Sequence, residues 1–145
     1  MKKILIKGRG AIPGKADGEA LVAKESFQGD SAINFETGEI IQKGHPLEGN
    51  NISGSILVLA GGRGSTGWSC RLHAAAVNGV GPAAMIFPKM DSRTAGASAV
   101  LNVPVVTDLD KDPFTEISTG DNVKIDGEQG TIEVIKKHVN YSHTN

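Results

Sequence analysis

The sequence predicts a single α/β domain in which a central parallel β-α-β layer lies between β-rich N- and C-terminal segments. Strand-like apolar runs and helical patterns alternate through the middle of the chain, as parallel β-α-β units require. Toward both ends, short apolar runs are separated by turns rich in Gly and Pro, which favours β-structure. The 145 residues suit one compact domain. We expect that domain over residues 1–135 and a disordered tail over 136–145.

The N-terminal part is expected to contain short strands and turns. Ile4–Ile6 and Gly18–Ala23 have strand patterns, and the Gly and Pro between them, in KGRGAIPGKAD, indicate a turn. Residues 35–41 predict a hairpin around a Thr-Gly pair.

The central layer begins with the continuous apolar run SILVLA, residues 55–60, which predicts a strand buried on both faces. A helix is expected over 68–78, where Gly79 is a typical C-terminal stop. A second strand, a second helix and a third strand are expected over 83–87, 92–101 and 103–108. After Pro113, the segment TGDNVKIDGEQGTIEVI predicts a β-hairpin.

Composition excludes several classes of function. The 15 basic and 16 acidic residues give a net charge of -1, so the chain lacks the basic surface of a nucleic-acid-binding protein. The N-terminus has no apolar stretch long enough for a signal peptide or membrane span, and we expect a cytoplasmic protein. Cys70 is the one cysteine, and an iron-sulfur cluster typically takes about four thiolates. The four histidines show no zinc-site spacing, so we expect no metal held by this chain alone.

The loop between the first central strand and the helix is the candidate site. It reads GGRGSTG, residues 61–67, and lacks the lysine of a phosphate-binding P-loop. Backbone N–H groups at a helix start favour an anion such as a carboxylate, and Arg63 can add a charged contact. The helix dipole behind these N–H groups would also stabilise Ser65 as an alkoxide, the form that acts as a base. Ser65 or Thr66 can equally be a helix cap. The sequence pattern by itself leaves both roles of Ser65, base and helix cap, open.

Three charged or titratable residues outside this loop are weaker candidates. Lys15 and Asp17 are expected in a turn that faces the same opening and are candidate substrate-binding residues, although charged turns are often only solvated. His73 lies about two turns beyond Ser65 on the expected helix, so a packing role is the simpler interpretation.

The chain resembles a known family, the small swivel subunit of aconitase X. The resemblance is carried by the following segments, in the family's order: KGRGAIPGKADGEALV, NFETGEIIQKGHPLEG, GSILVLAGGRGST, GPAAMIF and GDNVKIDGEQGTIEV. It covers about residues 7–134 and implies the swivelling β/β/α domain. That fold agrees with the architecture expected from the residues.

The resemblance also implies a function, that of the small subunit of a hydro-lyase. Ser65 corresponds to the serine that removes a carbon-bound proton, and Arg63, Gly64 and Thr66 to its substrate-facing neighbours. The family's loop continues with an arginine after its second serine, whereas this chain has Gly67 and Trp68. The resemblance implies a large catalytic subunit as partner, which carries the iron-sulfur cluster and without which this chain is inactive.

Two substrates and two other classes of function remain open at this point. We expect dehydration of cis-3-hydroxy-L-proline, because GSTGWSC differs from our expectation for the archaeal loop; the alternative is mevalonate 5-phosphate. A phosphohistidine-type swivel domain has the same architecture, but its histidine is missing from the corresponding segment at Asp91–Ala95. A stand-alone binding module is the other alternative.

Overall fold

The computed structural model describes residues 3–24, 32–60, 67–89 and 101–136, without the side chains of 67–71. In chain order the elements are β1 (Lys3–Lys7), β2 (Arg9–Ile12), β3 (Lys15–Ala23), β4 (Ile56–Leu59), α1 (Gly67–Val77), β5 (Ala84–Ile86), β6 (Val105–Thr107), α3 (Pro113–Glu116), β7 (Asn122–Asp126) and β8 (Thr131–Ile135). The strands form one eight-stranded sheet in the order β1-β8-β7-β3-β4-β5-β6-β2. This mixed α/β architecture is the predicted class.

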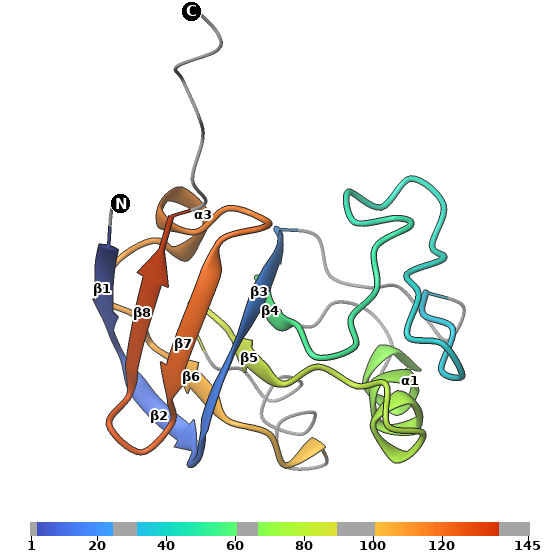
Figure 1. Cartoon of the computed structure of the whole chain (residues 1–145), viewed down its shortest axis with the longest axis horizontal. Coiled ribbons are helices and arrows are strands. Elements are labelled where there is room, and N and C mark those ends of the chain that lie inside the picture. Colours follow the sequence, from blue (N-terminus) through green and yellow to red (C-terminus); the bar gives the residue numbers. More distant parts are fainter. Residues whose placement is uncertain (1–2, 25–31, 61–66, 90–100, 137–145) are drawn as a thin grey trace, which may run out of the picture.

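The long strand β3 joins a parallel and an antiparallel layer. Its first half, Lys15–Glu19, pairs antiparallel with β7, and its second half, Ala20–Ala23, pairs parallel with β4. Strands β5 and β6 continue the parallel layer, while β8 and β1 continue the antiparallel one. Figure 1 shows α1 and residues 32–52 on the far side of the parallel strands from the β7–β8 hairpin.

The N-terminal stretch closes the sheet. β1 pairs with β8, and β2, separated from β1 by Gly8 alone, pairs antiparallel with β6 at the other end of the strand order. β2 crosses closely over the β7–β8 turn: a Cβ on Gly10 would lie 1.7 Å from the Gly127 oxygen. The expectation of one turn over KGRGAIPGKAD is therefore wrong at Arg9–Ile12, where Gly10 allows a strand to approach another backbone. Pro13 and Gly14, the latter with a φ of 123°, separate β2 from β3.

Two apolar clusters result from the alternation of side chains along the strands. One lies between the layers and takes side chains from β1, β3 to β8, such as Ile6, Ile56, Ile86 and Val123. The other lies on the opposite face of the parallel layer. It joins alternate residues of β3, β4, β5 and β6 to α1 and to residues 32–52. All four residues of β4 are buried, which confirms the expected central strand.

The other expected elements have mixed outcomes. Helix α1, strands β5 and β6 and the C-terminal hairpin are confirmed, with Gly79 in a positive-φ conformation after α1. Ile33 bridges Ile40 and Glu39 bridges Asn51, and these isolated bridges stand in place of the expected hairpin. Helix α3 was not expected. Most of the expected helix over 92–101 and most of the expected tail lie outside the described residues. No helix among the described residues has the length and apolar character to cross a membrane.

Candidate functional site

The candidate loop starts at the carboxyl edge of the parallel layer. β4 ends at Leu59, and α1 begins at Gly67. The predicted site residues Arg63, Gly64, Ser65 and Thr66 lie outside the described residues, so their roles stay predictions. Ligands of open α/β sheets bind outside the carboxyl ends of the strands, and a helix N-terminus favours anions. The positions of β4 and α1 therefore fit a loop that binds an anionic substrate.

The position of α1 determines toward which face of the sheet the chain runs after β4. Leu72 and Ala75 of α1 are fully buried, and they belong to the cluster that also contains Leu57 and Leu59 of β4. The chain thus passes from the carboxyl end of β4 to a helix on that face. Any substrate held by the loop is expected at this edge, on the α1 side.

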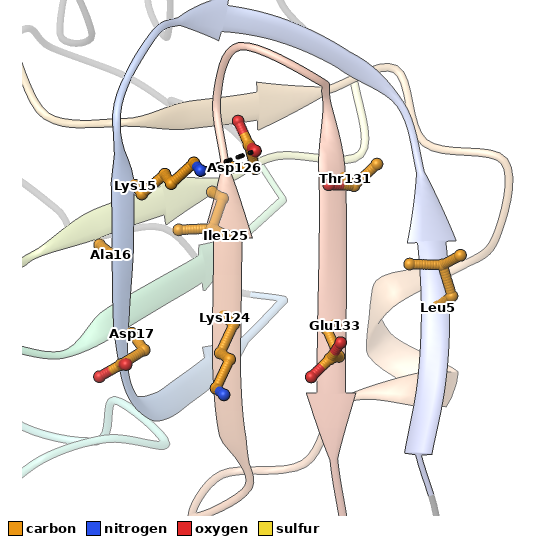
Figure 2. Close-up of a pocket in the computed structure, with 9 residues that line it drawn as sticks. All are labelled: Leu5, Lys15, Ala16, Asp17, Lys124, Ile125, Asp126, Thr131 and Glu133. Atoms are coloured by element: carbon orange, nitrogen blue, oxygen red, sulfur yellow. Dashed lines mark ion pairs between the residues drawn. The ribbon is translucent and has the colours of Figure 1, made fainter.

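Lys15 and Asp17 lie on β3, and the expectation that they occupy a turn is wrong. They line a hollow of about 560 Å³ on the outer face of the antiparallel layer, drawn in Figure 2. Its lining consists of Leu5, Lys15, Ala16, Asp17, Lys124, Ile125, Asp126, Thr131 and Glu133. The Lys15 Nζ lies 3.9 Å from Asp126 Oδ2.

The two residues stand at the opposite half of β3 from the end of β4. Ala23 pairs with Leu59, and Asp17 precedes Ala23 by six positions, about 20 Å of extended chain. Their predicted part in substrate binding stays a prediction. The signal for their true setting was present in the sequence, because KADGE alternates as a strand with one exposed face.

The described residues do not fit a metal or cluster site. They contain no group of three or more His, Cys, Asp or Glu side chains that could hold an ion. The single cysteine of the sequence falls well short of the thiolates of an iron-sulfur cluster. His73 is exposed on α1, and the buried His45 accepts a hydrogen bond at Nδ1 from the Leu47 N–H at 3.0 Å. His45 therefore has a structural role in its loop.

Comparisons with known proteins agree with this architecture. The family model of the aconitase X swivel domain matches residues 5–134. The chain is 39% identical over 129 residues to a phosphomevalonate dehydratase small subunit of Methanocella arvoryzae, covering 89% of this chain and 98% of that protein. It is 37% identical over 128 residues to the protein of the same name in Archaeoglobus fulgidus, covering 88% and 96%. The crystal structure of Thermococcus kodakaraensis aconitase X in its holo-form superposes with a TM-score of 0.82 at 28% identity, covering 92% of this chain and 99% of that one.

Proposed function

This chain belongs to the aconitase X swivel domain family, and we propose that it is the small subunit of a phosphomevalonate dehydratase. The observation that carries the proposal is the similarity to phosphomevalonate dehydratase small subunits over nearly their whole length. The expected preference for cis-3-hydroxy-L-proline finds no support in these relatives. Mevalonate 5-phosphate, the alternative substrate, fits them better.

In this proposal the chain supplies the base of a dehydration. Ser65, as its alkoxide, removes a proton from the carbon next to the substrate carboxylate, and the C–O bond to the β-hydroxyl breaks as the double bond forms. The departing hydroxide takes up one proton and leaves as water, which balances the proton taken by Ser65. Arg63 and the N–H groups of Gly64 and Thr66 are proposed to face the substrate and to stabilise its carboxylate. The start of α1 after this loop supports that arrangement.

The rest of the enzyme is a large subunit. The relatives are named as small subunits, which supports a partner chain of this kind. We propose that the partner carries the iron-sulfur cluster, because the donor set of this chain does not fit one. The isolated chain is then expected to be inactive.

Purification of the tagged chain from its native host, under anaerobic conditions, tests the proposal. A cysteine-rich larger chain should copurify, and the complex should dehydrate mevalonate 5-phosphate but not cis-3-hydroxy-L-proline. The reverse preference would overturn the proposed substrate. A chain that purifies alone and shows neither activity would overturn the assignment as an enzyme subunit.

A matched pair of variants tests the base. Ser65→Ala should abolish most turnover in the reconstituted complex. Ser53→Ala is the control, because Ser53 is an exposed serine in the turn before β4. Normal turnover by the Ser65 variant would remove that residue from the mechanism without affecting the family assignment.

A further inference from the structure

Arg9 is held in place by its two neighbouring glycines. The Gly8 N–H donates to the Gly130 oxygen at 2.7 Å, and a Cβ on Gly8 would lie 2.5 Å from the Thr107 oxygen. On the other side, Gly10 lies against the Gly127 backbone. The chain on both sides of Arg9 is thus packed against β6 and the β7–β8 turn, which fixes the position of the Arg9 backbone.

The guanidinium of Arg9 is oriented by a carboxylate. Its Nε donates to Asp108 Oδ2 at 2.8 Å, and the side chains are 58% and 42% exposed. Asp108 directly follows β6 and has a φ of 55°, a conformation that residues other than Gly seldom adopt. Within the described part of the chain no partner is found for the two Nη groups of Arg9. They are therefore available to an anion, and Asp108 limits the rotation of the group that carries them.

The position of Arg9 is the carboxyl edge of the parallel layer. Val58 of β4 pairs with Ile86 of β5, Ile86 with Val106 of β6, and Val106 with Gly10 of β2. One residue further toward the carboxyl edge, the row across the same four strands is Leu59, Phe87, Thr107 and Arg9. The row begins where the candidate loop leaves β4. Neighbouring strands lie about 4.8 Å apart, so Arg9 stands about 14 Å from Leu59 along this edge.

Arg9 also faces the same side of the sheet as α1. It is paired directly with Thr107, and paired residues of antiparallel strands share a face. Thr107 lies two residues after Val105 on β6, so the two side chains share a face, and Val105 packs in the cluster that contains α1. Thr107 is fully buried, and its Oγ1 has no hydrogen-bond partner in the described part of the chain, which is uncommon for a native hydroxyl. The residue paired with Arg9 thus carries a polar group without a described partner at this edge.

We propose that Arg9, oriented by Asp108, binds one of the two anionic groups of the substrate, its phosphate or its carboxylate. The proposal rests on the function proposed above. A substrate with an anionic group at each end can place one at the β4–α1 loop and the other toward Arg9, farther along the same edge. Arg9 is then a binding residue, and Asp108 is a positioning residue that acts through it.

Steady-state kinetics of the small–large complex test this assignment. Arg9→Gln should raise the KM for the substrate about 10- to 100-fold, the loss expected for charge-assisted hydrogen bonds, with a much smaller change in kcat. Asp108→Asn keeps the charge of Arg9 and should raise KM by a smaller factor. The control is Lys3→Gln, because Lys3 is an exposed cation paired with Glu133 at 3.6 Å on β1. Unchanged KM in the Arg9 variant would overturn the proposal.

Calorimetric titration of the same complexes with inorganic phosphate and with propionate identifies the group that is bound. Weaker binding of phosphate alone by Arg9→Gln assigns the phosphate, and weaker binding of propionate alone assigns the carboxylate. Unchanged binding of both would refute a role for Arg9 in anion binding. Because these titrations need no turnover, they test Arg9 even where the complex proves inactive on mevalonate 5-phosphate, the result that would overturn the proposed substrate.

Discussion

Replacement of Gly10 by alanine tests how closely β2 crosses the β7–β8 turn. A Cβ at this position would lie 1.7 Å from the Gly127 oxygen and 2.8 Å from the Gly127 carbonyl carbon, both backbone atoms. Neither atom can move by a side-chain rotation, so β2 or the turn must shift by more than an ångström. That shift threatens two short hydrogen bonds, from the Gly8 N–H to Gly130 and from the Gly127 N–H to Gly14, each 2.7 Å.

The expected cost follows from these contacts. Overpacking typically costs about 1–3 kcal/mol, and each weakened hydrogen bond adds up to about 1 kcal/mol. We expect Gly10→Ala to lower the free energy of unfolding by about 3 kcal/mol, measured by urea denaturation.

A second glycine provides the control. Gly44 has a φ of 81° and nothing within 4 Å of its would-be Cβ, so Gly44→Ala carries backbone strain alone, about 1 kcal/mol. A Gly10 variant no less stable than the Gly44 variant would show that β2 does not lie against the turn, and the closure of the sheet would be refuted.

Three further substitutions have distinct expected outcomes. Ser65→Ala should abolish most turnover and lower the free energy of unfolding by at most about 1 kcal/mol, the value of a helix cap; the same loss of stability with turnover retained would make Ser65 a cap alone. Asp121→Asn should destabilise by about 2 kcal/mol in thermal unfolding, because this 1% exposed carboxylate accepts from Lys136 Nζ at 2.6 Å and from the Ser118 N–H at 2.9 Å. In a Lys136→Met background the same Asp121 substitution should cost less stability. Equal losses in the two backgrounds would contradict the pairing of Asp121 with Lys136. Thr107→Val should leave stability unchanged or raise it by about 1 kcal/mol, since it removes a buried hydroxyl without a described partner; a clear loss in urea denaturation would reveal a hydrogen bond there.

The sequence predicted the elements whose local pattern and burial agree. SILVLA became β4 because each of its faces packs in one of the two apolar clusters, while β3 and β5 pair with its two edges. The C-terminal hairpin formed around Asp126, whose Oδ1 accepts from the N–H groups of Glu128 and Gln129 at 3.0 and 3.1 Å. In both cases the information lies within a few residues of the element itself.

The sequence did not predict the closure of the sheet. Lys3 pairs with Ile135 and Arg9 with Thr107, contacts between residues far apart in the chain that no local pattern reveals. The Gly and Pro of KGRGAIPGKAD favour a turn when considered locally. Gly10 instead lets β2 approach Gly127 without a side chain between them, and this role depends on a hairpin at the other end of the chain.

The same long-range pairing explains why the sequence pattern does not indicate Arg9 as a binding residue. Within the sequence it is one basic residue in a Gly-rich segment, far from the loop at 61–67. Pairing of β2 with β6 brings it to the edge at which β4 ends and next to Asp108, which the chain reaches about a hundred residues later. A binding residue assembled by strand order in this way has no spacing motif. What connects Arg9 to the candidate loop is the row of neighbouring residues that runs across the sheet from Leu59 to Arg9.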